Sequence, residues 1–202
     1  MKIIIVGASG RIGKEVDKAL SGSHEIVRVG VRSGDVQCDY TDTESVREMF
    51  NKIGEFDSLI SVAGGDSTFK SFQDLGDEDY RYGFERKFLG QIRFLKLGES
   101  SIRDNGSYVF TSGYLSHYPN PASIATGPLN AAVDTFVKNT APLLSRGVRV
   151  NVVSPAPIVD PGQESEGVVT AAETAKLYVE AVEGNITGQV LRAWGGLPVV
   201  PE

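Results

Sequence analysis

Hydrophobic and polar residues follow one another along the chain in blocks that fit strands and helices in turn. Ile3 to Val6 form a β-branched run without a polar break, which is typical of a strand buried on both faces of a parallel sheet. Short apolar runs recur at intervals, and stretches with helical spacing of apolar residues separate them. The pattern predicts strands over residues 3–6, 25–31, 35–38, 59–63, 107–112, 148–153 and 188–193.

The predicted helices are marked by their ends as well as by their periodicity. Asp42 or Thr43 is suited to cap a helix that Gly54 ends, and Pro128 occupies the first turn of a later helix that Pro142 ends or kinks. The expected helices cover about 14–20, 43–53, 77–102, 127–142 and 171–182. Three of them carry apolar stripes: Val46, Met49, Phe50 and Ile53; Phe84, Phe88, Ile92 and Leu95; Leu129, Ala132, Val133, Phe136 and Val137.

Strands that alternate with helices in this way indicate an α/β protein. We predict a single Rossmann-type, doubly wound parallel β-sheet of about seven strands with helices on both faces, in one domain over residues 1–202. In such a sheet the ligand binds at the carboxyl ends of the strands.

A glycine turn joins the first strand to the first helix. Gly7, Gly10 and Gly13 follow the strand at three-residue spacing, and a helix-like segment begins at once. Glycine permits the tight bend and a close approach of the backbone to a pyrophosphate, and the helix N-terminus supplies free N–H groups. This context predicts a dinucleotide-binding turn rather than the alternative, a tight turn without a ligand.

The residues after the second strand bear on which dinucleotide binds. An acidic residue about 20 positions beyond the glycine turn favours NAD(H), whereas this chain has Arg32 and Ser33 and no carboxylate there. A guanidinium group donates two hydrogen bonds to a phosphate, and Arg11, inside the turn, would add a second cation. The alternative is that Arg32 and Arg11 are ordinary solvated side chains on the surface and bind no phosphate. We predict NADP(H), with NAD(H) less favoured.

The composition of the chain limits the kinds of binding partner that we expect. The 202 residues carry a net charge of −6, which argues against nucleic acid and anionic membranes as partners. No apolar run approaches the roughly 18 residues that span a membrane, so a cytoplasmic protein is expected. The single cysteine, Cys38, is expected to be a small buried side chain. His24 and His117 lie far apart, and no metal site is predicted.

By the fifth predicted strand the chain resembles the short-chain dehydrogenase/reductase family. The matching segments are residues 7–13 (GASGRIG), 61–65 (SVAGG), 148–157 (VRVNVVSPAP) and 186–190 (ITGQV), together with Asp39 and Ser112. The resemblance implies that Asp39 contacts adenine, that residues 63–64 pass the adenosine ribose, and that residues 154–158 run beside the nicotinamide. The expected cofactor-binding residues are Gly7, Ser9, Gly10, Arg11, Ile12, Gly13, Arg32, Ser33, Asp39, Tyr40, Ala63, Gly64, Gly65, Pro155, Ala156 and Ile158.

The same comparison predicts an unusual active site. The family has a Tyr-x-x-x-Lys motif on the helix before the sixth strand, and alignment on NAAVDTF places Thr126 and Asn130 at its two positions. The family's helical asparagine corresponds to Lys87 in the segment KFLG. Ser112 is the one family residue type kept in place, so lysine and asparagine have exchanged positions and tyrosine is absent.

Loss of the tyrosine leaves the proton donor open. The alcohol of Thr126 is a poor acid, although with Ser112 it would polarise a carbonyl. Lys87 falls at the margin of its helix's apolar stripe, so it either extends to solvent or points towards Asn130, where burial would lower its pKa. We rank Lys87 first as donor and Tyr114 second. Tyr118 is a further candidate in the same loop, where aromatic residues more often form pocket walls.

These residues predict an NADP(H)-dependent oxidoreductase that acts on a small carbonyl or alcohol substrate. The alternative is a catalytically inactive NADP(H)-binding sensor or scaffold. Cofactor-binding residues that match the family, together with catalytic residues that do not, are compatible with both an enzyme and a sensor. A polar residue at each replaced position favours the enzyme. The resemblance also implies a homodimer or homotetramer formed through the helices of Lys87 and Asn130, whose outer faces are expected to include Phe94, Leu97 and Phe136.

Overall fold

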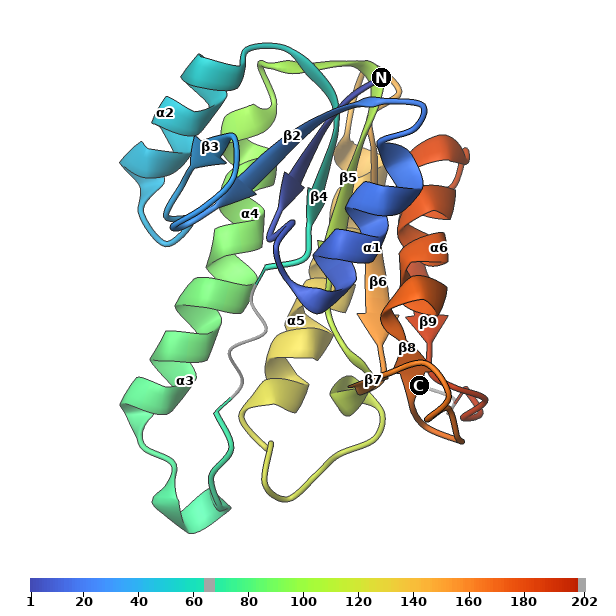
Figure 1. Ribbon diagram of the computed structural model, residues 1–202. Helices are drawn as coiled ribbons and strands as arrows, with labels where there is room; N and C mark the ends of the chain where they lie inside the picture. Colours follow the sequence, from blue (N-terminus) through green and yellow to red (C-terminus); the bar gives the residue numbers. More distant parts are fainter. Residues whose placement is uncertain (64–67, 200–202) are drawn as a thin grey trace.

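Seven parallel strands form the central sheet, in the order β3-β2-β1-β4-β5-β6-β9 (Figure 1). The computed structural model describes residues 1–63 and 68–199. The strand order reverses beside β1, which pairs with β2 on one side and β4 on the other. This confirms the predicted doubly wound sheet. Its strands are β1 (Lys2–Val6), β2 (Glu25–Gly30), β3 (Val36–Gln37), β4 (Phe56–Ser61), β5 (Ile102–Thr111), β6 (Arg149–Pro155) and β9 (Val190–Ala193).

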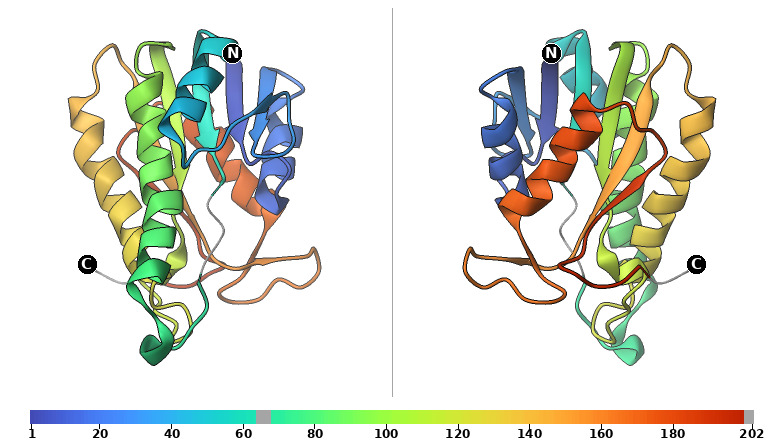
Figure 2. Two further views of the ribbon diagram at one scale, coloured as in Figure 1. Left: turned by 90° about the vertical axis from the view of Figure 1, so that its left-hand side faces the viewer. Right: turned by 90° about the vertical axis from the view of Figure 1, so that its right-hand side faces the viewer.

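Helices cover both faces of the sheet. Figure 2 shows α1 and α6 on one face and α2, α4 and α5 on the other. The two faces hold separate apolar clusters, and the alternating side chains of β1 enter both: Ile4 and Val6 on one side, Ile3 and Ile5 on the other. The helices are α1 (Arg11–Leu20), α2 (Thr43–Ile53), α3 (Asp77–Gly83), α4 (Gly90–Gly98), α5 (Thr126–Thr140) and α6 (Ala171–Glu183).

The residues predicted to begin and end α2 do so in the structure. The side chain of Asp42 accepts a hydrogen bond from the N–H of Glu44, which caps the helix. Gly54 ends it with a φ of 71°, a conformation that favours glycine. The four apolar side chains of the predicted stripe are buried, as is Cys38.

The helix predicted over 77–102 differs from the structure. It consists of α3, a π-helical segment η2 (Phe84–Leu89) and α4, and it ends at Gly98. The last helical residue packs closely on its neighbours, because a Cβ on Gly98 would lie 2.7 Å from the hydroxyl of Tyr108 and 2.8 Å from the ring of Phe50. Ile102 instead begins β5.

The π-helical turn also changes which side chains face the core. The N–H of Gly90 donates to the carbonyl of Glu85, five residues back, so the turn is wider than an α-turn. Phe84, expected in the apolar stripe, is 42% exposed. The prediction assumed an unbroken 3.6-residue period, and the wider turn breaks it.

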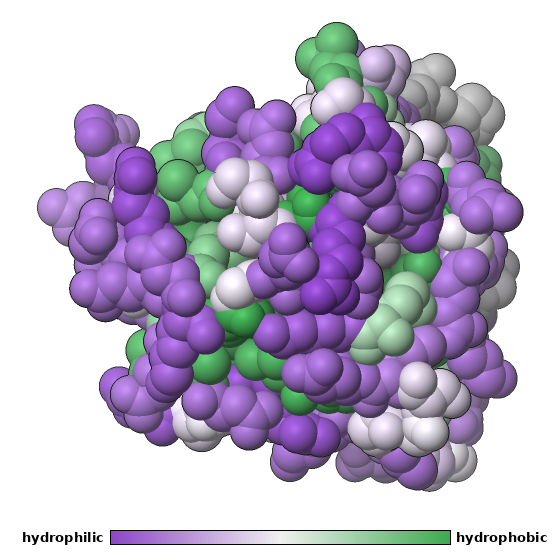
Figure 3. Space-filling view, turned by 90° about the horizontal axis from the view of Figure 1, so that it is seen from above, coloured by the Kyte–Doolittle hydropathy of each residue, from purple (hydrophilic) through white to green (hydrophobic). Residues whose placement is uncertain are grey.

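The segment after β6 contains two short strands that the sequence did not predict. β7 (Ile158–Val159) pairs in parallel with β8 (Val169–Thr170) as a separate small sheet. Both strands lie at the carboxyl end of the main sheet (Figure 1). The opposite end of the molecule presents mostly hydrophilic side chains (Figure 3). Among the helices of residues 1–63 and 68–199, none has the length and apolar character needed to cross a membrane.

Candidate active site

The glycine turn after β1 has the geometry of a tight backbone cradle. Gly7 has a φ of +86°, and its carbonyl accepts the N–H of Gly10 at 3.0 Å. A Cβ on Gly13 would lie 2.2 Å from that same carbonyl oxygen. The side chain of Ile12 packs against the core. The N-terminus of α1 is therefore held against the end of β1, with its first N–H groups at the carboxyl edge of the sheet.

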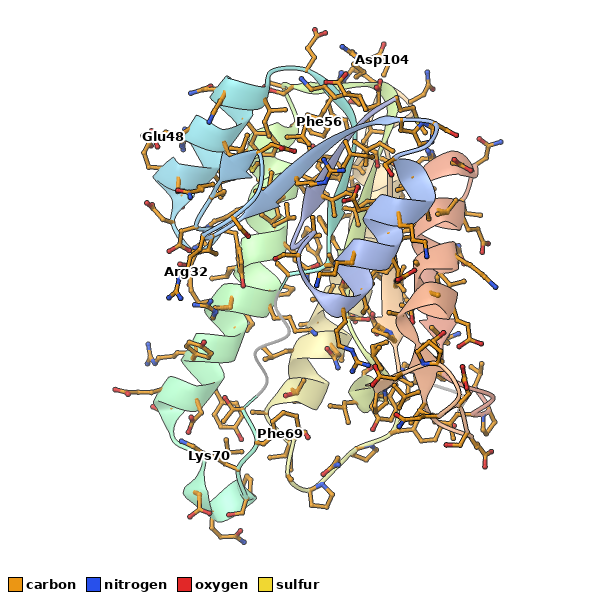
Figure 4. The ribbon with its side chains drawn as sticks, in the orientation of Figure 1. Arg32, Glu48, Phe56, Phe69, Lys70 and Asp104 are labelled. Carbon is orange, nitrogen blue, oxygen red and sulfur yellow. The ribbon has the colours of Figure 1, made fainter. Side chains whose placement is uncertain are left out.

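A pocket of about 360 Å³ adjoins this turn. It extends over the carboxyl ends of β1, β2 and β4, where the strand order reverses. Figure 4 shows Arg32 in the loop that follows β2, at the rim of the molecule. Six residues predicted to bind the cofactor line the pocket: Gly7, Ser9, Arg32, Ser33, Tyr40 and Ala63. Gly64 and Gly65 lie outside the described residues.

Arg86 also lines this pocket, and the sequence analysis missed it. It projects from η2, with its guanidinium carbon 5.8 Å from the ring centroid of Tyr40 and 5.1 Å from that of Tyr82. Nothing in a one-dimensional pattern links residue 86 to the loops after β2 and β3. The arginine therefore adds a second cation to the pocket of Arg32.

Arg11 does not supply that second cation. Its guanidinium donates to the carbonyl of Ile158 and to Oδ1 of Asp160, both at 2.7 Å. It therefore faces the segment after β6 rather than Arg32, because a carboxylate and a carbonyl attract it there. This corrects the expectation for Arg11. The contact joins two of the predicted cofactor segments, the glycine turn and residues 155–158.

The remaining predicted cofactor residues lie at the same edge of the sheet. Oδ1 of Asp39 accepts hydrogen bonds from the N–H and the hydroxyl of Thr41, which lower the pKa of the Asp39 carboxyl. Pro155 ends β6, and the N–H of Ala156 donates to the carbonyl of Ala193 at 2.7 Å. These contacts fix both segments at the carboxyl ends of their strands.

Lys87 points into the molecule. Its Nζ donates to the backbone carbonyl of Ser112 at 2.9 Å. Burial lowers the pKa of Lys87 to about 8, and the charge of Asp134 partly opposes that change. The sequence allowed Lys87 either to extend to solvent or to point inward, and in the structure it points inward.

Ser112 and Asn130 meet at the end of β5. A Cβ on Gly113 would lie 2.9 Å from Nδ2 of Asn130, so the amide packs directly on the backbone beside Ser112. Ser112 Oγ and Asn130 Oδ1 are buried and have no hydrogen-bond partner within the described part of the chain. Thr126 is 4% exposed and lies one turn before Asn130 on α5. Unpartnered buried polar atoms of this kind are typical of a site that binds a ligand.

Gln91 fixes Lys87 relative to Ser112, and no pattern in the sequence pointed to it. Its side chain accepts the N–H of Thr111 at 2.8 Å and donates to the carbonyls of Thr111 and Lys87, at 3.1 and 2.7 Å. The amide therefore bonds the helix of Lys87 to the residue that precedes Ser112.

Tyr114 has a different environment. It begins the short helix η3 (Tyr114–Ser116), and its ring packs against a small cluster that contains Ala156 and Ala193. Its ring centroid lies 6.2 Å from that of Tyr118, whose hydroxyl donates to the carbonyl of Pro198. These contacts are packing contacts, and neither tyrosine bonds to Ser112 or Lys87 in the described part of the chain. The structure brings Lys87, Ser112 and Asn130 together and places Tyr114 in the adjoining loop.

Comparison with known proteins identifies the family. A family model described as enoyl-(acyl carrier protein) reductase matches residues 3–192. The chain belongs to the short-chain dehydrogenase/reductase family. It is similar to General stress protein 39 of Bacillus subtilis, with 26% identity over 130 residues, which are 64% of this chain and 46% of that protein. This chain thus covers less than half the length of that relative.

Two solved structures extend the comparison to the fold. The protein lin1944 from Listeria innocua is 32% identical to this chain, with a TM-score of 0.90. The match covers 96% of this chain and 100% of that one. A small-chain dehydrogenase in complex with NADPH is 27% identical, with a TM-score of 0.87, and the match covers 97% of each chain. The short-chain dehydrogenase/reductase family consists of oxidoreductases that use NAD(H) or NADP(H).

The residues present suit such a dinucleotide. The cradle at Gly7 and Gly13 leaves no room for side chains, so a pyrophosphate can approach the backbone N–H groups of α1. The adjoining pocket carries hydroxyl and guanidinium donors at Ser33 and Arg32. Ser112 and Asn130 stand at the carboxyl ends of the central strands, where the reactive end of a dinucleotide lies in this fold.

Proposed function

We propose that this protein is an NADP(H)-dependent oxidoreductase that interconverts a small carbonyl compound and its alcohol, with Lys87 as proton donor. The observation that carries the proposal is the inward position of Lys87. Its Nζ lies 2.9 Å from the carbonyl oxygen of Ser112, beside two buried polar atoms, Ser112 Oγ and Asn130 Oδ1, that lack partners within the described residues.

Each residue of the site has a separate task in this mechanism. Bound NADPH would supply the hydride. Ser112 donates a hydrogen bond to the substrate carbonyl and favours negative charge on its oxygen. Lys87 gives a proton from Nζ to that oxygen, and Asn130 presents an amide to the nicotinamide ribose. Thr126 adds a hydroxyl at the edge of the site, and the tyrosine of the family motif has no counterpart at that position.

The choice of NADP(H) rests on the pocket at the end of β2. Arg32, Ser33 and Arg86 all line it. Two guanidinium groups and a hydroxyl match a 2′-phosphate, which is a dianion with several acceptor oxygens. One structural relative carries NADPH in its crystal, and this supports the same choice.

The test combines binding with turnover. NADPH binding is followed by fluorescence, and its oxidation is then measured with aldehydes, ketones, quinones and an enoyl thioester, since the matching family is described as an enoyl reductase. We expect binding and turnover, with Ser112→Ala slower by about 10²-fold. Binding without turnover on every compound would contradict the enzyme and favour the NADP(H)-binding sensor.

The dependence of the rate on pH tests Lys87 directly. Because Lys87 donates only as the ammonium, the rate of reduction is expected to be constant below its pKa and to fall as the pH rises through about 8. Lys87→Met loses the proton, and Lys87→Arg keeps the charge but releases its proton far less readily. Both variants are expected to bind NADPH and lose turnover.

Lys96→Met provides the matched control, because Lys96 is an exposed lysine of α4. This variant should keep the rate and the pH profile of the parent protein. Full turnover in Lys87→Arg would contradict proton donation by Lys87 and would assign the residue a purely electrostatic role.

A further inference from the structure

An exposed loop carries Arg32 and Ser33, two of the residues that line the cofactor pocket. Residues 31–35 connect β2 to β3, and all five are exposed. A loop that must be ordered when a ligand binds lowers the affinity, because its conformational freedom is lost at that moment. The contacts that order this loop in the free protein therefore bear on how well it holds a 2′-phosphate.

Asp35 closes the loop against β2 by hydrogen bonds in both directions. The N–H of Arg28 donates to Oδ2 of Asp35 at 2.9 Å, and the N–H of Asp35 donates to the carbonyl of Arg28 at 2.8 Å. The pairing of β2 with β3 begins only at the next residue, Val29. Asp35 thus satisfies both backbone groups of the residue that precedes this pairing.

The backbone of the loop folds closely onto β2. Gly34 has a φ of +113°, and a Cβ there would lie 2.6 Å from the carbonyl oxygen of Arg28. A Cβ on Gly30 would lie 2.7 Å from the carbonyl oxygen of Ser33. The arrangement of the loop therefore depends on glycine at residue 34 as well as on the hydrogen bonds of Asp35.

The side chain of Arg28 connects the loop to α1, the helix that follows the glycine turn. Its Nε and Nη2 donate to the two carboxylate oxygens of Asp17, on α1, at 2.7 and 2.8 Å. Its Nη1 lies 3.7 Å from Oδ2 of Asp35. The guanidinium thus lies between two carboxylates, and its charge offsets that of Asp35, which would otherwise repel a phosphate.

We propose that Asp35 is a positioning residue for cofactor choice, which holds residues 31–34 in the arrangement that presents Arg32 and Ser33 to the 2′-phosphate of NADP(H). The inference rests on the proposed function, which takes NADP(H) as the cofactor. Asp35 is not among the described residues that line the pocket, so it acts through the loop.

The charge of Asp35 and its hold on the loop predict opposite changes in NADPH binding. If only charge mattered, removal of a carboxylate near the pocket would strengthen the binding of a 2′-phosphate dianion. Because Asp35 orders the loop, Asp35→Ala is expected to weaken NADPH binding by about tenfold and to leave NADH binding unchanged. Titration calorimetry of the cofactor-free protein with each dinucleotide measures both affinities.

Two further variants separate the hydrogen bond from the charge. Asp35→Asn keeps an acceptor for the N–H of Arg28 and removes the charge, so it should bind NADPH at least as tightly as the parent protein. Glu48→Ala is the matched control, because Glu48 is an exposed acidic residue of α2 (Figure 4). Its loss should weaken the binding of neither dinucleotide.

Gly34→Ala disturbs the loop without any change of charge. It should weaken NADPH binding more than NADH binding, and it provides the same comparison if Asp35→Ala does not fold. In an Arg32→Met protein, Asp35→Ala should add little further loss, because both substitutions remove the same contact with the phosphate. Independent, additive losses would contradict an action of Asp35 through Arg32.

The parent protein separates this inference from the function on which it rests. If the parent prefers NADPH and Asp35→Ala keeps that preference, the role of Asp35 is overturned and the choice of NADP(H) stands. If the parent binds NADPH and NADH equally, the choice of NADP(H) is overturned, and the inference with it. If NADPH is preferred through Asp35 but no compound is reduced, the proposed catalysis fails and the positioning role stands.

Discussion

At the level of single residues, Lys87 shows how strongly local helix geometry decides the position of a charge. On an ideal α-helix it falls at the margin of an apolar stripe, where a lysine can extend to water as easily as turn inward. In the structure it lies in the π-helical segment η2 and bonds to Ser112. Periodicity alone cannot choose between these positions, since it assumes 3.6 residues per turn and the π-helical turn is wider.

Arg32 leads to a prediction about cofactor choice. Removal of its guanidinium in Arg32→Met should weaken NADPH binding by about tenfold or more, since a charge-assisted hydrogen bond contributes roughly 1.5–3 kcal/mol. NADH binding should change little, because it lacks the 2′-phosphate. Titration calorimetry with each dinucleotide measures both effects.

Arg47→Met is the matched control for this measurement. Arg47 is an exposed arginine of α2 and does not line the pocket, so its loss changes the net charge equally. Equal weakening of NADPH and NADH by Arg32→Met would contradict a role in reading the 2′-phosphate.

At the level of elements, the amide of Gln91 joins α4 to β5. It is 2% exposed and pairs with both backbone groups of Thr111. Gln91→Leu would leave the buried N–H of Thr111 unsatisfied, so we expect a loss of about 1–3 kcal/mol in the free energy of unfolding. Urea denaturation measures it. The exposed Gln189, changed to Leu as a control, should have almost no effect.

A second consequence concerns the site. Because Gln91 also bonds the carbonyl of Lys87, the variant should lower turnover more than NADPH binding. A stable Gln91→Leu protein with unchanged unfolding free energy would contradict the assignment of this amide as the link between α4 and β5.

The elements differ in how far the sequence determines them. α2 was predictable because its cap at Asp42, its apolar stripe and its terminal Gly54 all lie within one short segment. The strands β7 and β8 were not, because each has two residues and pairs with residues eleven positions away. The face of α5 was misjudged in part: the predicted stripe followed its apolar residues, while Thr126, Asn130 and Asp134 are buried.

At the level of the whole molecule, the fold and the cofactor edge were predictable and the chemical site was predictable only in outline. The order of strands, glycine turn and helices follows from local patterns that a single chain carries. Arg86 and Gln91 join the site through contacts between elements far apart in sequence, and no spacing rule reveals them. Lys87 and Asn130 were found because the family pattern supplied the positions to compare.

The surface through which copies of the chain were expected to associate differs from the one that the sequence predicted. Phe94, predicted on an outer face, is fully buried, and Leu97 and Phe136 pack against the core. Their apolar character therefore gives no support for association. Exposed aromatic side chains lie instead on α3 and η2, with Phe84 42% exposed, beside a groove of about 850 Å³ that also includes Leu129 of α5.

We predict that two copies of the chain associate through this surface. An interface of standard size buries about 1,600 Å² in total, and a charge at its centre would remain unpaired and desolvated. Phe84→Glu should therefore convert a dimer to monomers, or a tetramer to dimers, in light scattering at micromolar concentration. Leu143→Glu, at an apolar side chain 80% exposed near the other end of α5, should leave the mass unchanged. A parent protein that is itself monomeric would contradict association. A Phe84→Glu protein that stays oligomeric would place the interface elsewhere, since no single glutamate can be buried between copies without a large loss of affinity.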